Sequence, residues 1–152
     1  TQEVNYFTLG QPSREGLFLV DLPGYGYARE SKDRIATWID LVMTYLQGRA
    51  TLRRVLLLID ARHGIKKNDE EVMAMLDKAA VSYLIVLTKA DKLKKGEIEK
   101  RLETTKAQLR KHVAAFPEIA VTSSEKGTGI PELRAHIAEL AELAPMGYKA
   151  DK

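Results

Sequence analysis

The sequence predicts an α/β fold with a doubly wound, mostly parallel sheet covered by helices. Two observations support this prediction. Short apolar runs without a polar break are typical of strands buried on both faces, and apolar residues recur at helical spacing between them. The apolar runs are Leu17–Val20, Val55–Ile59 and Tyr83–Leu87. A chain of 152 residues suits one domain, which we expect over residues 1–144, with a flexible tail at 145–152.

The first two strands are predicted to form a hairpin. Val4–Leu9 is rich in aromatic and β-branched residues, and turn-forming residues follow at 10–15. The strand through Val20 therefore returns antiparallel, although its unbroken apolar run alone is typical of a buried parallel strand. A helix is predicted from about Ser31, its expected N-cap, with Trp38 in the core. Its apolar face contains Ile35, Trp38, Ile39, Val42, Tyr45 and Leu46.

The middle of the chain predicts two further strands around a helix. Val55–Asp60 is a strand that ends in a carboxylate, and Gly64 breaks it. Asn68 or Asp69 is expected to cap the helix. The next strand, Tyr83–Leu87, leads through Thr88–Asp91 to a basic loop at residues 92–96. The helix is expected to bury Val72, Met73, Met75, Leu76 and Ala79.

The last third of the chain predicts a long charged helix, a short strand and a final helix. The charged helix is expected over residues 97–115, ended by Pro117, and the strand over 119–121. Pro131 suits the first turn of the final helix, which is expected to reach about Leu143. The apolar stripe of the charged helix contains Ile98, Leu102, Leu109 and Val113.

Composition limits the classes of function. The sequence contains no Cys, which excludes disulfides, zinc-thiolate sites and thiol nucleophiles and fits a cytoplasmic location. No apolar run approaches the ~20 residues of a membrane span, so we expect no membrane partner. The formal net charge of +3 permits an RNA partner without requiring one, and we expect no DNA partner. His63, His112 and His136 lack metal-ligand spacing, which favours surface or capping roles.

Three strand ends carry polar motifs that a parallel sheet brings to one edge. An Asp followed by a Gly at a strand end suits a site for Mg²⁺ and phosphate. A second Asp can accept two N–H bonds from the edge of guanine, which adenine lacks. A lysine stem can lie along the base, and a backbone N–H can donate to the O6 oxygen. The motifs are Asp21-Leu22-Pro23-Gly24, Thr88-Lys89-Ala90-Asp91 and Thr122-Ser123-Ser124.

In this order and spacing the motifs resemble the third, fourth and fifth motifs of GTPases. The stretch of residues 21–28, read Asp-Leu-Pro-Gly-Tyr-Gly-Tyr-Ala, resembles more narrowly the signature of the EngB family of bacterial GTPases. That family lies in the TrmE-Era-EngA-EngB-septin-like class. Thr-Lys-Ala-Asp at 88–91 and Ser-Ser-Glu-Lys-Gly at 123–127 also match it. The resemblance covers residues 1–143 and implies the P-loop NTPase fold of Ras-like GTPases.

The resemblance also implies GTP and GDP binding with Mg²⁺, slow GTP hydrolysis, and a role in assembly of the large ribosomal subunit. Some members of the family are linked to cell division and septation. The large subunit or its rRNA is then the expected partner. Asp21 would hold Mg²⁺ through water, Gly24 would sense the γ-phosphate, and Thr1 would be a Mg²⁺ ligand. The implied nucleotide-binding set is Thr1, Gln2, Glu3, Asp21, Leu22, Pro23, Gly24, Thr88, Lys89, Ala90, Asp91, Thr122, Ser123 and Ser124.

Two departures from the GTPase pattern affect these expectations. The sequence contains no Gly-x₄-Gly-Lys-[Ser/Thr] motif. We therefore expect the phosphate loop and first strand to precede Thr1 in a longer protein, and this chain alone to be inactive. Tyr25 stands where Ras-like enzymes carry a water-orienting Gln. We then expect a K⁺ ion, an RNA surface or another group to organise the attacking water, and we name no catalytic residue.

Three alternatives remain open from the residues alone. Asp60 with Thr88-Lys89 imitates the phospho-acceptor site of a receiver domain, but residues 1–16 offer no acidic pair for it. A nucleotide-independent binding module that has lost the phosphate loop would keep the same fold. The basic residues form either an RNA-facing patch or a solvated face; they are Arg49, Arg53, Arg54, Lys92, Lys94 and Lys95.

Overall fold

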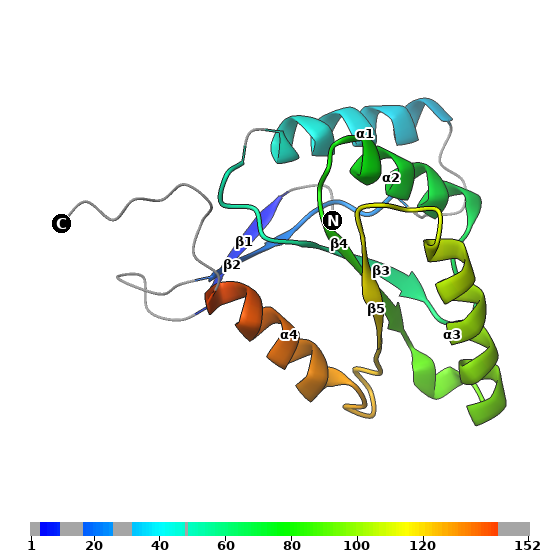
Figure 1. Cartoon of the computed structure of the whole chain (residues 1–152). Helices are drawn as coiled ribbons and strands as arrows, with labels where there is room; N and C mark the ends of the chain where they lie inside the picture. Colours follow the sequence, from blue (N-terminus) through cyan, green and yellow to red (C-terminus); the bar gives the residue numbers. More distant parts are fainter. Residues whose placement is uncertain (1–3, 10–16, 26–31, 48, 143–152) are drawn as a thin grey trace. The chain divides into compact units, whose positions relative to one another are not determined.

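The computed structural model describes residues 4–9, 17–25, 32–47 and 49–142 (Figure 1). These residues fall into two compact units, which we describe one at a time. The first contains residues 1–52 and 137–152, and the second residues 53–136. The expectation of one domain over residues 1–144 stays a prediction, and the expected tail lies outside the described residues.

The first unit contains the predicted hairpin. β1 (Asn5–Leu9) pairs antiparallel with β2 (Leu17–Asp21), with Asn5 opposite Asp21 and Leu9 opposite Leu17. The hairpin prediction is confirmed, whereas the interpretation of Leu17–Val20 as a buried parallel strand is wrong. β2 belongs to a two-stranded sheet among the described residues, and the side chain of Phe18 is 66% exposed.

The helix of the first unit is α1 (Lys32–Leu46), close to its predicted position. Val42 and Leu46 are buried, as the helical spacing predicted. The indole N–H of Trp38 donates to the carbonyl of Pro23, and the Trp38 ring lies 4.9 Å from the ring of Tyr25. Trp38 therefore connects α1 to the turn after β2. The expected N-cap at residue 31 lies outside the described residues.

The second unit is built on a parallel sheet in the order β3-β4-β5, and Figure 1 shows its three strands side by side. The strands are β3 (Val55–Asp60), β4 (Tyr83–Thr88) and β5 (Ala115–Val121). β4 is the central strand, and its residues 83–87 are all buried. The parallel pairing confirms the prediction for this part of the chain.

Helix α2 (Lys67–Lys78) follows β3 and buries Val72, Met73 and Leu76, as predicted. The predicted cap was wrong by two or three residues, because Lys66 is the N-cap and Asp69 lies in the first turn. The carboxylate of Asp69 accepts the backbone N–H of Lys66 at 2.7 Å. An acidic side chain thus satisfies an otherwise unpaired donor from within the helix.

The helix after β4 is shorter than predicted, and the strand after it is longer. A 3₁₀ turn, η1 (Ala90–Lys92), and α3 (Lys95–Leu109) occupy the segment where a basic loop and a helix over 97–115 were expected. β5 then begins at Ala115 and includes Pro117, which was expected to end a helix. The pairing register of β4 with β5 shifts between Tyr83 and Ile85, next to this proline, which lacks a backbone donor.

Contacts with α2 explain why α3 stops at Leu109. The buried ring of His112 places Nδ1 2.6 Å from Oδ2 of Asp77, and the N–H of Ala114 donates to Oδ1 of Asp77 at 2.9 Å. These bonds require the chain to leave the helix and turn before β5, and Val113 is 90% exposed rather than part of an apolar stripe.

The final helix is α4 (Ile130–Glu142), with Pro131 in its first turn as predicted. Within the second unit, Nη1 of Arg54 donates to Nε2 of His136 on this helix at 2.8 Å, and the His136 ring packs edge-on against Phe116. Arg54 also lies 3.9 Å from the centre of the Phe116 ring. Arg54 is therefore engaged in packing.

The helices in the described part of the chain were compared with the length and hydropathy that a membrane span requires, and none of them meets both.

Replacing Tyr83 with Phe is expected to raise the free energy of unfolding by about 1 kcal/mol, because a buried hydroxyl without a partner costs desolvation energy. The Tyr83 hydroxyl has no hydrogen-bond partner among the described residues, and burial raises the pKa of Tyr83 well above its ordinary value. Urea unfolding at pH 7 measures the difference. A loss of stability of similar size would mean that the hydroxyl is bonded.

Candidate functional site

The carboxyl ends of β4 and β5 are joined by backbone hydrogen bonds. The N–H of Ala90 donates to the carbonyl of Thr122 at 3.0 Å, and the N–H of Thr122 donates to the carbonyl of Leu87 at 2.7 Å. The Thr122 hydroxyl donates to the same Leu87 carbonyl at 3.0 Å. Parallel pairing thus confirms the prediction of a shared edge for two of the three motifs, residues 88–91 and 122–124. The third motif, residues 21–24, follows β2 of the antiparallel sheet in the first unit.

Asp91 and Ser123 meet directly at this edge. The hydroxyl of Ser123 donates to Oδ1 of Asp91 at 2.7 Å, and the Asp91 side chain is only 8% exposed. This bond is the main reason why the pKa of Asp91 lies below its ordinary value, and Lys92 lowers it further. Asp91 is therefore a carboxylate at neutral pH, with lone pairs left to accept donors from a ligand.

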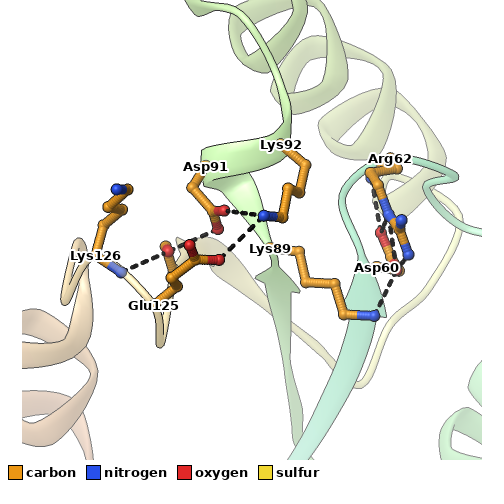
Figure 2. A network of polar contacts seen from close by, with 8 residues as sticks. Asp60, Arg62, Lys89, Asp91, Lys92, Glu125 and Lys126 are labelled. Carbon is orange, nitrogen blue, oxygen red and sulfur yellow. Dashed lines mark hydrogen bonds and ion pairs between the residues drawn. The ribbon is translucent and has the colours of Figure 1, made fainter.

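Lys92 links the two loops across this edge. Its Nζ lies 3.3 Å from Oδ2 of Asp91 and 3.0 Å from Oε2 of Glu125, and both partners raise the pKa of Lys92 (Figure 2). The basic residues around Lys92 indicated either an RNA-facing patch or a solvated face, and Glu125 had no predicted role of its own. The opposite charges of Lys92 and Glu125 were the signal available in the sequence, but only the fold shows that these two side chains meet.

Lys89 lies beside β3. Its backbone is left-handed, with φ 58° and ψ 34°, and its Nζ lies 3.1 Å from Oδ2 of Asp60 (Figure 2). Asp60 also accepts a forked pair of bonds from Arg62, with Nη2 2.7 Å from Oδ2. Hydrogen bonds from Arg62 hold the pKa of Asp60 far below its ordinary value, with a smaller effect of Lys89.

The loop between β5 and α4 is held by its own backbone. The N–H of Ser123 donates to the carbonyl of Thr128 at 2.9 Å, and the N–H of Lys126 donates to the Ser123 hydroxyl at 3.0 Å. Of the two backbone donors predicted for this loop, that of Ser123 is therefore already engaged. Within the described ranges, the backbone N–H groups of Ser124 and Glu125 carry no hydrogen bond and can donate to a ligand oxygen.

Gly129 allows the close approach that shapes this loop. Its φ is 70°, and a Cβ placed on it would lie 1.9 Å from the carbonyl oxygen of Val121. Gly127 has a similar φ of 74°, but nothing lies within 4 Å of the corresponding position. The loop therefore needs glycine at 129 for space and at both positions for conformation.

The remaining predicted site residues lie in the first unit. Asp21 ends β2 with an exposed side chain, Pro23 is buried, and nothing lies within 4 Å of a Cβ placed on Gly24. Residues 1–3 lie outside the described residues, so the role of Thr1 stays a prediction. No cluster of three metal-ligating side chains occurs in the part of the chain that the structure describes. One carboxylate from the protein, such as Asp21, suits Mg²⁺, which commonly keeps water and phosphate ligands.

Comparison with known proteins identifies the same family along most of the chain. Residues 37–143 match the family model described as the elongation factor Tu GTP binding domain. The chain is 59% identical over 142 residues to a probable GTP-binding protein EngB of Rhodospirillum rubrum, covering 93% of this chain and 62% of that protein. It is 54% identical to the corresponding protein of Rhizobium johnstonii, covering 95% and 69%. The chain thus spans about two thirds of the length of these relatives.

Solved structures show the same fold. The elongation factor SelB of Methanococcus maripaludis, in complex with the GTP analogue GppNHp, matches with a TM-score of 0.70 at 23% identity. The match covers 95% of this chain and 29% of SelB. A bacterial selenocysteine-specific elongation factor matches with a TM-score of 0.66 at 25% identity, over 92% of this chain and 22% of that one. The predicted Ras-like GTPase fold is confirmed.

Replacing Gly129 with Ala is expected to lower the free energy of unfolding by about 3 kcal/mol, since the new Cβ overlaps the Val121 carbonyl and the positive φ disfavours Ala. Gly127→Ala is the matched control, because it shares the φ penalty of about 1 kcal/mol without the overlap. Urea unfolding of both variants separates the two costs. Equal losses would show that Gly129 is needed for conformation alone.

Asp60→Asn is expected to destabilise the protein above about pH 4 and to have a diminishing effect as the pH falls further. A carboxylate whose folded pKa lies below its unfolded value stabilises the fold above the unfolded pKa, near 4. That contribution declines as the pH falls below the unfolded pKa, where the unfolded chain takes up the proton first, and it is gone once the pH passes the folded pKa. The measurement is the urea midpoint of both proteins between pH 7 and pH 2. A difference that does not change with pH would contradict the depressed pKa.

Proposed function

Because the chain belongs to the EngB family of GTP-binding proteins, we propose that the intact protein binds GTP and GDP and hydrolyses GTP. The observation that carries this proposal is the bond from the Ser123 hydroxyl to Asp91. It holds an ionised carboxylate in place where two loops of the sheet edge meet. Such a group suits a ligand that presents two N–H donors side by side.

Guanine is the base that fits this arrangement. Its N1–H and N2–H₂ would donate to the two oxygens of Asp91. The backbone N–H groups of Ser124 and Glu125 would donate to its O6 oxygen. Adenine has no donor at N1 and an amine in place of O6, so it would leave these groups unpaired. We propose that Lys89 lies with its stem along the base, and that Thr88, Ala90 and Thr122 hold the backbone beneath it.

The phosphates and Mg²⁺ are assigned to other residues. We propose that Asp21 holds Mg²⁺ through water, that Gly24 approaches the γ-phosphate, and that Thr1 is a further metal ligand. The phosphate and Mg²⁺ part of the proposed nucleotide site is completed by Gln2, Glu3, Leu22 and Pro23. Mg²⁺ would neutralise charge on the phosphates. Trp38, bonded to the Pro23 carbonyl, supports this turn.

The phosphate loop is proposed to lie in the part of the protein beyond the printed sequence. The printed sequence has no such motif, and the chain spans 62% of the Rhodospirillum rubrum relative. The intact protein would then be needed for hydrolysis, and this chain alone would be inactive. Since Tyr25 replaces a water-orienting Gln, intrinsic hydrolysis would be slow and would rely on K⁺, an RNA surface or another group to place the water.

We propose for this chain the role that the resemblance to the family implies: a cytoplasmic switch in assembly of the large ribosomal subunit, with a link to cell division and septation. GTP would order the segment after Asp21, and hydrolysis would release it. The subunit or its rRNA would be the partner, without DNA or membrane. Arg54 and Lys92 are already engaged in contacts, so Lys94 and Lys95 are better candidates for contacting RNA.

Asp91→Asn in the intact protein is expected to weaken GDP binding by about a hundredfold or more, and to favour xanthosine diphosphate over GDP. The variant loses the acceptor for the N2 amine and gains a donor that suits the C2 carbonyl of xanthine. The measurement is competition of unlabelled GDP, GTP, ATP and xanthosine diphosphate against fluorescent GDP.

Glu125→Gln is the matched control for this experiment. It breaks the ion pair with Lys92 and leaves the Ser123–Asp91 bond in place, so guanine preference should persist. An Asp91→Asn variant that still prefers GDP would overturn the base assignment. A wild-type protein that binds neither GDP nor GTP would instead favour a binding module that keeps the fold without the nucleotide.

A further inference from the structure

Asp60 ends β3 next to the lysine that the proposed function assigns to the base. Asp60 lies opposite Thr88 in the β3–β4 register, so Lys89 directly follows its partner residue. The Nζ atom of Lys89 lies 3.1 Å from Oδ2 of Asp60, and both belong to the second unit. A phospho-acceptor role for Asp60 was an alternative that lacked its acidic pair, and the oxygens of Asp60 accept bonds from Arg62 and Lys89.

We propose that Asp60 is a positioning residue for guanine binding, which holds the Lys89 side chain in the orientation that the base requires. This inference rests on the proposed function and deepens it. Asp60 would not touch the nucleotide itself and would act through Lys89.

The backbone of Lys89 restricts where its side chain can go. Its left-handed conformation is rare for a residue with a Cβ, and it is held by the Lys92 N–H donating to the Lys89 carbonyl at 3.0 Å. The Cα–Cβ direction is therefore determined by the fold. The stem still has four rotatable bonds, and its side chain is 55% exposed. The ion pair with Asp60 restrains Nζ, the far end of the Lys89 side chain.

Asp60 is itself held firmly enough to act as an anchor. The backbone N–H of Arg62 donates to Oδ1 at 3.0 Å, and the Arg62 guanidinium bonds both oxygens. Nη2 of Arg101, on α3, donates to the Arg62 carbonyl at 3.2 Å. A Cβ on Gly64 would lie 2.2 Å from Nη1 of Arg101, so this arginine lies directly on the turn. The chain of contacts runs from α3 to Lys89.

The expected effect on binding is moderate because the pair is exposed. Exposed ion pairs contribute little to stability, but a side chain that is already ordered loses less freedom when a ligand binds. Loss of the anchor should weaken nucleotide binding by about three- to tenfold. The stem of Lys89 contacts the face of the base, which guanine and hypoxanthine share. The ratio of GDP to IDP affinity should therefore stay constant, unlike after a change at Asp91.

The test is a double-mutant cycle on the full-length protein, with GDP and IDP affinities measured by competition against fluorescent GDP. Asp60→Asn should weaken both nucleotides by the same three- to tenfold factor. In a Lys89→Met background, Asp60→Asn should cause no further loss, and Asp60→Glu should restore most of the affinity in the wild-type background. Asp69→Asn removes the same charge from the first turn of α2, the helix that follows β3, and should leave GDP affinity unchanged.

Two results would overturn the inference alone: unchanged GDP affinity in a folded Asp60→Asn variant, or an equal loss with and without Lys89. A wild-type protein that binds no guanine nucleotide would overturn the proposed function as well.

If Asp60→Asn does not fold, the test is the salt dependence of binding, measured with uncharged guanosine as the probe. High salt screens the exposed Lys89–Asp60 pair, so it should weaken guanosine binding to the wild type and leave Lys89→Met unaffected. Equal salt dependence would overturn the inference.

Discussion

The parallel pairing of β4 with both of its neighbours is the constraint on which the candidate site depends. In this register Asp60 lies opposite Thr88 and Leu87 opposite Val121, so three polar connections begin at almost the same level of the sheet. The buried side chains of β4 hold that level, because a shift of the register would move apolar groups out of the core. The short backbone bonds from Ala90 to Thr122 and from Thr122 to Leu87 then join the loops themselves. The geometry of the candidate site therefore follows from the pairing of β4 with β3 and β5.

The two carboxylates at this edge have defined partners, which form two sets. Asp91 accepts a bond from Ser123 and pairs with Lys92, which also pairs with Glu125. Asp60 pairs with Arg62 and Lys89 (Figure 2). The first set keeps the Asp91 carboxylate ionised with lone pairs to spare. The second set restrains the side chain of Lys89. In the function proposed above, these two sets bind the base, and Asp21 and Gly24, which belong to the other unit, serve the phosphates and Mg²⁺.

Where sequence reasoning about the fold was wrong, a contact distant in sequence decided the outcome. Apolar spacing continued the helix after residue 97 through Val113, but His112 and Ala114 bond to Asp77 of α2, 35 and 37 residues earlier, and the chain leaves the helix at Leu109. Pro117 was assigned a helix-ending role and instead lies in β5 beside a register shift. The apolar run of β2 suggested a buried parallel strand, yet its described partner is the antiparallel β1. Propensity and spacing act locally and contain no information about such partners.

The sequence by itself determined the class of fold, the order of most elements and the motifs at the strand ends. Apolar runs and turn residues are local properties, and the eight residues at 21–28 are specific enough to indicate the family. Only the tertiary structure decided that the Ser123 hydroxyl meets Asp91, that Lys92 bridges to Glu125, and that Asp60 holds Lys89. The physical reason is that the two residues of each pair are separated by 29 to 33 positions in the sequence. Their distances depend on the strand register and on a left-handed lysine backbone, which are set by the packed sheet.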